Sequence, residues 1–426
     1  MSKRTRHVIV WSVVAVMVAA AAAIVLAGVP RWTKVRLPER PGVADAAGAY
    51  DPDLWAPAAL KITDARLLTP VDLSNGTSVQ LLASVYETPP LRGVPGTRSD
   101  VFAAPDQIGY GRALVAMDKR RAFMAWVDDF DAAYRDASTG WHCVSLQMTE
   151  AGSLQRGPAR WSVTLAYARA LLEGYDAFGG RTLKAAVTAV SDRLLPVFQA
   201  RETAEPLTVG SRMLLGFDAW DRPPRDLVPE PGEDVPVEHG VGTYLADIDL
   251  WALYALSRFD PAWAPIATAW ETTLRQAWTD GDVPYYASAV ADDGTYYAVT
   301  GEGHAIKMRE QLTIALHVAE TGHAEPHFIA MLRTALRDRM ALPRSIHVVS
   351  GAPSSEAEAV DYALARLLGR ATGDDVLTRV AYDAMARSRA SSQTSDIFGG
   401  WYRPGATVRT YRLVAADQTA VLRALR

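Results

Sequence analysis

The sequence predicts an all-α domain over residues 51–426, an (α/α)6 toroid of six helical hairpins preceded by one N-terminal transmembrane helix. Six segments share an aromatic or acidic start and an Ala/Leu-rich middle that is apolar all round, as in a helix packed on both sides. They alternate with segments whose helical pattern has a polar face. Helix pairs that recur along a chain indicate a repeat architecture, and six pairs close a ring. An open solenoid of helical pairs is the alternative.

The inner helices are expected where the pattern is apolar all round, at 109–118, 160–180, 244–260, 304–323, 354–373 and 408–425. The outer helices are expected at 119–136, 182–200, 262–278, 327–339 and 375–389, with one further partner in 51–100. In such a ring the loops at the N-termini of the inner helices surround one funnel. Helix dipoles there favour carboxylates on structural grounds alone.

The N-terminal 29 residues predict a cytoplasmic stub and a transmembrane signal anchor. Residues 8–29 carry no charge, and 22 helical residues span about 33 Å, the thickness of a bilayer's hydrocarbon core. Lys3, Arg4 and Arg6 precede this run, as in a signal anchor, and a cleaved signal peptide is the alternative. Residues 30–50 are expected to be a linker. The protein is thus predicted in the cell membrane, single-pass, with its bulk extracytoplasmic.

Loops of two kinds interrupt the helical pattern. A β-hairpin is expected in 64–86, because Asn75-Gly76 suits a tight primed turn. Two long insertions, 202–243 and 280–303, are rich in Pro and in Tyr respectively. Their aromatic side chains would either stack on sugars or pack the loops onto the ring.

Charge and motifs exclude several functions. Residues 1–40 hold seven basic and one acidic side chain, so the remainder holds 37 basic and 47 acidic ones. An acidic body argues against nucleic acid as a partner. Because Cys143 is the only cysteine and no H-E-x-x-H motif occurs, we expect no metal site. No glycine-rich phosphate loop occurs either, and no cofactor is predicted.

Three stretches together resemble the family-8 glycoside hydrolases, (α/α)6 enzymes that hydrolyse β-1,4-glucans and related polysaccharides with inversion. Asp106–Gly111 (DQIGYG) is similar to the family's S-E-G-x-G-Y-G segment. Asp247–Leu256 (DIDLWALYAL) is similar to D-A-D-L-W-I-A-Y-A-L, and His304–Met308 (HAIKM) is similar to the D-A-I-R-V type of motif. The resemblance covers roughly residues 101–320.

The resemblance implies an altered catalytic pair. Asp106 stands where the family has a glutamic acid as general acid, and His304 stands where it has an aspartate base. A histidine can act as a base near neutrality, and neighbouring Glu302 is a second candidate. In the family the second motif lies on the hairpin directly after the first, which corresponds here to residues 160–168. The expected substrate-binding residues are Tyr110, Trp161, Arg160, Asp247, Asp249 and Glu302.

The function implied is that of a membrane-anchored extracytoplasmic glycoside hydrolase acting on polysaccharide by inverting acid/base hydrolysis. That chemistry needs a protonated carboxyl and a base about 6.5–9.5 Å apart. The alternative is a catalytically inactive glycan-binding or exopolysaccharide-assembly partner on the same fold. Another sugar enzyme, such as a lyase or an epimerase, is a third possibility, because folds do not fix reactions.

Overall fold

The structure is a computed structural model of the 426-residue chain. It describes residues 34–40, 52–89, 94–202, 219–222, 238–281, 283–291, 294–298, 305–348, 350–405 and 409–426. One compact unit ends at Arg36 and a second runs from Leu37 to Arg426. The predicted membrane segment, 8–29, lies outside the described residues. None of the helices that the structure describes is both long and apolar enough to cross a membrane.

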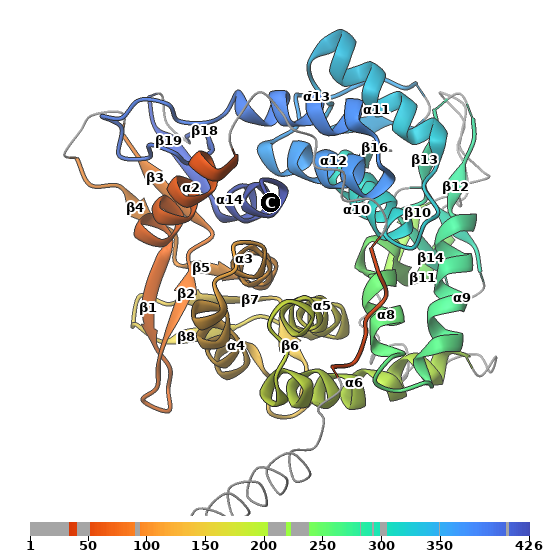
Figure 1. Cartoon of the computed structure of the whole chain (residues 1–426), viewed down its shortest axis with the longest axis horizontal. Helices are drawn as coiled ribbons and strands as arrows, with labels where there is room; N and C mark the ends of the chain where they lie inside the picture. Colours follow the sequence, from red (N-terminus) through yellow and green to blue (C-terminus); the bar gives the residue numbers. More distant parts are fainter. Residues whose placement is uncertain are drawn as a thin grey trace, which may run out of the picture. The chain divides into compact units, whose positions relative to one another are not determined.

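Within the second unit, six inner helices stand in a ring and six outer helices surround them (Figure 1). The inner helices are α3 (Ala104–Ala116), α5 (Trp161–Phe178), α8 (Leu250–Leu256), α10 (Met308–Ala319), α12 (Ala359–Thr372) and α14 (Ala415–Ala424). The outer helices are α2 (Pro52–Arg66), α4 (Arg120–Tyr134), α6 (Arg181–Glu202), α9 (Trp263–Gln276), α11 (Pro326–Arg339) and α13 (Asp375–Ala386). The predicted alternation of inner and outer helices is confirmed. Because α14 packs against both α3 and α2, the ring is closed and the solenoid alternative is wrong.

Burial explains why the two sets of helices have different sequences. The inner helix α5 is covered on all sides, and Leu165, Ala168 and Leu172 are each fully buried. The outer helix α4 buries one face, with Phe123 at 0% and Phe130 at 1% exposure, and leaves the other to solvent. An inner helix must therefore be apolar all round, which made these segments recognisable.

The all-α class describes the helical frame but omits nineteen short strands among the described residues. All pair antiparallel. The two-stranded sheets are β1 (Leu68–Asp72) with β2 (Ser78–Leu82), β6 (His142–Cys143) with β9 (Ala159–Arg160), β12 (Trp278–Thr279) with β13 (Tyr285–Tyr286), and β16 (Ala305–Lys307) with β17 (Ser345–His347). A three-stranded sheet joins β5 (Val101–Ala103), β7 (Ser145–Met148) and β8 (Leu154–Arg156).

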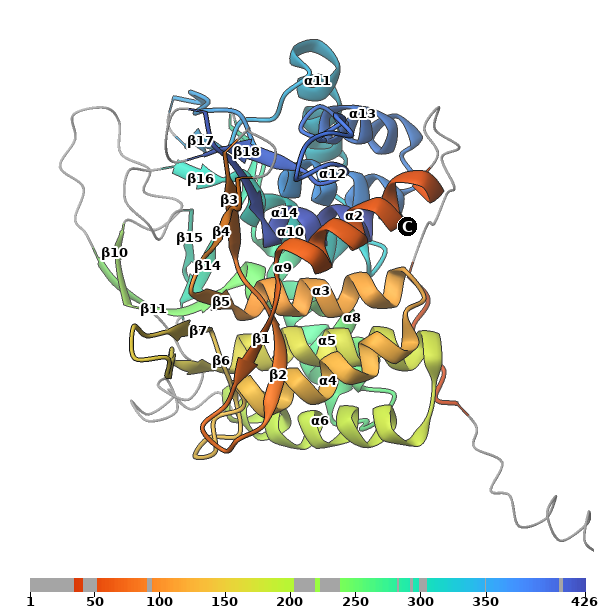
Figure 2. The same ribbon diagram turned by 90° about the vertical axis from the view of Figure 1, so that its left-hand side faces the viewer.

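Two four-stranded sheets complete the set. One has the order β10 (Ala219–Arg222), β11 (Glu238–Tyr244), β14 (Ala289–Ala291), β15 (Tyr296–Tyr297). The other has the order β18 (Tyr402–Pro404), β19 (Tyr411–Val414), β3 (Val85–Thr88), β4 (Thr97–Arg98). Many of the strands gather at the end of the ring where the inner helices begin, and we call this end the mouth (Figure 2). Helices α3, α5, α10 and α14 each begin at the residue after a strand.

The predicted hairpin around Asn75 is confirmed as β1 and β2. Leu68 pairs with Leu82 and Asp72 with Ser78. The Thr77 amide donates a hydrogen bond of 3.0 Å to the Asn75 side-chain oxygen. Gly76 has a φ of 80°, a conformation that glycine adopts without a steric penalty.

A repeated polar contact ties the inner helices to the connections around them. The fourth residue of α3, α10 and α14 is a glutamine. Its side-chain amide accepts a hydrogen bond from the backbone N–H of one residue and donates one to the backbone carbonyl of the same residue. These pairs are Gln107 with Leu82, Gln311 with Tyr286 and Gln418 with Trp401. In α5 and α12 the same position accepts one backbone N–H, through Thr164 from His142 and through Tyr362 from Leu342. Only α8, with Leu253 there, lacks such an anchoring side chain among the six described inner helices.

The glycines of the DQIGYG segment serve close packing. A Cβ at Gly109 would meet the Thr419 hydroxyl of α14 at 2.6 Å, and one at Gly111 would meet the Trp126 ring of α4 at 2.6 Å. The segment therefore brings α3 against two neighbouring helices.

Candidate active site

The mouth of the ring gathers carboxylates at equivalent positions. The third residue of four inner helices is acidic: Asp106 in α3, Glu310 in α10, Asp361 in α12 and Asp417 in α14. Helix dipoles stabilise negative charge at these positions, so their number alone indicates no chemistry. The surroundings of each carboxylate decide which one can react.

Asp106 is the carboxyl whose environment suits an acid. Its side chain is buried, at 8% exposure. Burial raises the pKa of Asp106 to about 6, and the negative charge of Asp417 adds to the rise. A hydrogen bond from the Ser84 hydroxyl and the positive charges of Arg309 and Arg403 oppose the rise. A carboxyl with this pKa is largely protonated at mildly acidic pH and keeps a small protonated fraction at neutral pH.

Ser84 connects Asp106 to two helix starts. Its hydroxyl accepts a hydrogen bond of 3.1 Å from the Ala103 amide, just before α3. Its carbonyl accepts one of 2.9 Å from the Ala415 amide, the first residue of α14. Ser84 therefore fixes α3 and α14 relative to each other where Asp106 and Asp417 lie.

The other carboxylates of this quadrant are bound by arginines. Asp417 accepts from Arg403 Nε at 2.6 Å and from the Val360 amide at 3.0 Å. Burial raises the pKa of Asp417, and Arg403 opposes that rise. Arg309 donates to Asp361 at 3.0 Å and to Glu358 at 2.7 Å. These carboxylates are held as ion-pair partners rather than left available to a substrate.

Three residues predicted to bind substrate lie in or next to α3 and α5. Tyr110 is 7% exposed and donates a hydrogen bond of 2.8 Å to Asp64 of α2. Trp161 is 3% exposed and packs edge-on against Phe198 at 5.3 Å between ring centroids. Arg160, in β9 just before α5, is half-buried, and its backbone pairs with His142. Of the three, only Arg160 keeps substantial exposure.

Asp247 and Asp249 lie on either side of a turn before α8. Asp247 ends a short 3-10 helix, Leu245–Asp247, and is half-buried. Asp249 is the N-cap of α8 and accepts from the Ala252 amide at 2.9 Å. It also accepts from Arg169 at 2.8 Å. Burial opposes ionisation of Asp249, but Arg169 above all lowers its pKa to about 2.

His304 and Glu302, the candidate bases, lie outside the described residues. The described chain resumes at Ala305, the first residue of β16, which runs directly into α10. In the part of the chain that the structure describes, no group of three His, Cys, Asp or Glu side chains could hold a metal ion.

A buried ion network crosses the centre of the ring, and sequence reasoning missed it. Arg169 of α5 is 1% exposed and bonds Glu173 at 2.8 Å, Asp249 at 2.8 Å and Glu320 at 2.7 Å. Glu173 in turn accepts from Arg112 of α3. The signal was present, because Arg169 and Glu173 are charges four residues apart inside an otherwise apolar helix. We call these five residues the central ion network.

Solved structures share this fold. The chain is similar to a structure described as a novel α-amylase from Clostridium perfringens, with 14% identity and a TM-score of 0.62 over 87% of this chain and 96% of that one. It is also similar to a cold-adapted family 8 xylanase, with 11% identity and a TM-score of 0.58 over 91% of this chain and 94% of that one. An endo-β-1,4-glucanase from Acetobacter xylinum matches with 14% identity and a TM-score of 0.51 over 79% of this chain and 99% of that one.

The likeness establishes the fold as family-8 glycoside hydrolase-like, which the three motifs predicted. No protein-family model matches the sequence, and no curated protein sequence matches it. Identities this low carry the architecture and leave the reaction to be argued from the site.

Proposed function

We propose that the protein is a membrane-anchored extracytoplasmic glycoside hydrolase that cleaves a polysaccharide, a β-1,4-glucan or a similar chain, with inversion. The observation that carries the proposal is Asp106. By the resemblance it takes the motif position of the general acid, on a fold shared with xylanases and glucanases, and burial raises its pKa to about 6.

In this mechanism Asp106 donates its proton to the glycosidic oxygen as the bond to the sugar breaks. A water molecule attacks the opposite face of the sugar ring, and a base takes its proton. His304 or Glu302 is the proposed base. Asp417, Asp361 and Glu358 are poor candidates, because arginines already bind their oxygens.

The proposed substrate-binding residues divide by burial. Arg160 and Asp247 lie at the starts of inner helices and are half-buried, so they can contact a sugar directly. Tyr110, Trp161 and Asp249 are buried, so their proposed role is to position the helices that carry the site. Glu302 is the remaining proposed contact.

The second candidate is a glycan-binding or exopolysaccharide-assembly partner without activity. The observation that favours it is the reach of Asp106, whose side chain is one methylene shorter than glutamate and largely buried. If the carboxyl cannot reach the glycosidic oxygen, the ring binds a glycan and leaves it intact.

The test is hydrolysis by the full-length chain. Incubation with a panel of β-glucans should release new reducing ends, and Asp106→Asn should lower the rate by about 10²–10⁴, the usual contribution of positioned acid catalysis. Asp375→Asn is the matched control, since it removes a first-turn carboxylate from the outer helix α13 and should leave the rate unchanged. If wild type cleaves every glycan that it binds only at the background rate, the result would favour the inactive binding partner.

The membrane arrangement has its own test. A reporter enzyme that is active only outside the cytoplasm, fused after Arg426, should be active. Activity restricted to a cytoplasmic reporter would contradict the proposed topology.

A further inference from the structure

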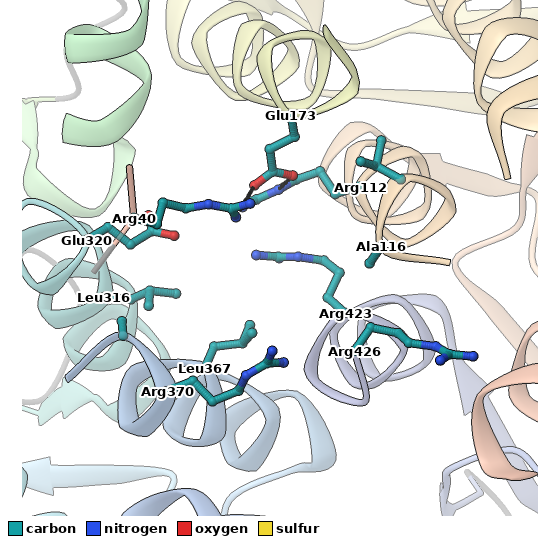
Figure 3. Close-up of a pocket in the computed structure, with 12 residues that line it drawn as sticks. Arg40, Arg112, Ala116, Glu173, Leu316, Glu320, Leu367, Arg370, Arg423 and Arg426 are labelled. Atoms are coloured by element: carbon teal, nitrogen blue, oxygen red, sulfur yellow. Dashed lines mark hydrogen bonds and ion pairs between the residues drawn. The ribbon is translucent and has the colours of Figure 1, made fainter. Parts of the chain in front are cut away.

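A cavity lies in the ring at the end where the inner helices finish (Figure 3). Its volume is about 330 Å³. Five arginines line it, Arg40, Arg112, Arg370, Arg423 and Arg426, together with two carboxylates, Glu173 and Glu320. We call it the arginine cavity. Leu316 and Leu367 supply an apolar part of its wall.

The two carboxylates that line the cavity accept hydrogen bonds from arginines other than Arg423. Glu173 accepts two hydrogen bonds from Arg112, at 2.9 and 2.7 Å, one from Arg169 at 2.8 Å and one from Arg40 at 3.4 Å. Both oxygens of Glu320 accept from Arg169, at 2.7 and 2.8 Å. Both carboxylates that line the cavity are therefore already hydrogen-bonded to arginines other than Arg423.

Arg423 is the side chain that these pairs leave out. It extends from α14 into the cavity, and it makes no hydrogen bond or ion pair with any residue that the structure describes (Figure 3). Burial lowers the pKa of Arg423 to about 9; repulsion from Arg112 and Arg169 adds to the shift, and attraction by Glu173 and Glu320 opposes it. A cation in the last turn of a helix interacts favourably with the helix dipole. That effect accounts for an arginine at the end of α14 but not for the convergence of four more on one cavity.

We propose that the arginine cavity binds a small phosphate ester, with Arg423 as the principal ligand and Arg40 and Arg370 beside it. A guanidinium donates a fork of N–H groups that matches the oxygens of a phosphate. A doubly charged tetrahedral group uses donors from several directions, as this ring of arginines offers. The volume, at the lower end of the range for small-molecule sites, exceeds what an ion alone needs, and the apolar wall suits the organic part.

The ester could be a free metabolite or the headgroup of a phospholipid, which share this chemistry. The positive charge is confined to this cavity, because the domain as a whole is acidic and attracts no polyanion. The proposal is independent of hydrolysis at the mouth, and its experiment measures binding alone.

The experiment uses the full-length chain in detergent and titrates inorganic phosphate and glycerol 3-phosphate by calorimetry at constant ionic strength. We expect one site per chain and tighter binding of the ester. Arg423→Gln should weaken both by about tenfold or more, through loss of a charge-assisted contact. Arg379→Gln, which removes one exposed charge from α13, should bind like wild type.

Thermal unfolding separates a ligand role from a structural one. Without phosphate, Arg423→Gln should unfold at the same temperature as wild type or higher, because a repelled cation is removed. With phosphate, the unfolding temperature should rise for wild type and rise clearly less for the variant at the same phosphate concentration. A variant that unfolds early without phosphate, or that binds phosphate like wild type, would overturn the proposal, as would binding no better than that of chloride.

Nanodiscs distinguish the two sources. If the wild-type chain, but not Arg423→Gln, unfolds at a higher temperature in discs of phosphatidic acid than in discs of phosphatidylcholine, the ligand is a lipid headgroup. A response to glycerol 3-phosphate alone assigns the free ester.

Discussion

The two ends of the ring gather different charged side chains, carboxylates in the first turns of the inner helices at the mouth and arginines around the cavity at the other end. At the mouth the inner helices begin, and Asp106, Glu310, Asp361 and Asp417 lie in their first turns. At the other end the helices finish, and arginines line a cavity. Helix dipoles favour anions at the first end and cations at the second.

What distinguishes a site from this background is the group without an ion-pair partner. At the mouth, Asp417 and Asp361 are bound by arginines, while Asp106 has a hydroxyl as its hydrogen-bonding neighbour. At the other end, Arg112 is bound by Glu173, while Arg423 has no partner among the described residues. The comparison teaches that helix dipoles alone do not single out a site, and that the proposed acid and the proposed phosphate ligand are groups without an ion-pair partner among the described residues.

The largest expected effect comes from breaking the central ion network between the two ends. Arg169→Met would leave Glu173, Asp249 and Glu320 buried without their shared cation, at a cost of about 3–5 kcal/mol in unfolding free energy. Urea unfolding measures it. The control is Arg333→Met, which removes a partly exposed pair with Asp374 and should cost about 1 kcal/mol or less. If the two variants lost equal unfolding free energy, the central ion network would contribute no more to stability than a surface ion pair.

A smaller effect of opposite sign is expected at Asp106. Its folded pKa, about 6, lies above the unfolded value of about 3.9, so the folded state binds the extra proton between these two values. Stability therefore falls as pH rises from 4 to 6 and stays reduced above. Asp106→Asn should be more stable than wild type at pH 7, by up to about 3 kcal/mol, and equal near pH 4. A difference that does not change with pH would contradict the assignment of the raised pKa to Asp106.

The smallest effect concerns the tuning of Asp106 by Arg309. This guanidinium lowers the pKa of Asp106 through its charge, although burial dominates. Arg309→Gln should therefore raise the Asp106 pKa by a fraction of a unit, since Arg309 is 43% exposed and screened by solvent. Carbon NMR titration of the aspartate carboxyl groups measures it without any activity. The same titration in Arg379→Gln should show no shift, and a downward shift in Arg309→Gln would be incompatible with this electrostatic role.

The helices could be predicted from sequence because each inner helix is apolar all round and each outer helix has one polar face. Helix α12, for example, falls inside the predicted segment 354–373. Apart from the hairpin of β1 and β2, the short strands were not predicted, because runs of two to seven residues are set by the neighbouring connection rather than by their own pattern. The anchoring glutamines left a usable signal, since Asp106-Gln107, Glu310-Gln311 and Asp417-Gln418 repeat an acid followed by Gln at each helix start.

The site was predictable only in part. A family motif pointed to Asp106, but the partners that set its pKa, Ser84 and Asp417, come from distant segments. The central ion network is equally non-local: Arg169 meets Asp249 from 80 residues away and Glu320 from 151. No local pattern specifies such pairs, because the closed ring brings them together.

Closure by α14 also has a consequence for the order of events during synthesis. The last helix packs against α12, α3 and α2, and β19 just before it pairs with β3, with Leu413 opposite Tyr86. The surroundings of Asp106 thus depend on Asp417, which a ribosome adds more than three hundred residues later. Contacts of such high sequence separation form late and slow folding. Until α14 has been synthesised, the faces of α12, α3 and α2 that receive it are uncovered in the nascent chain.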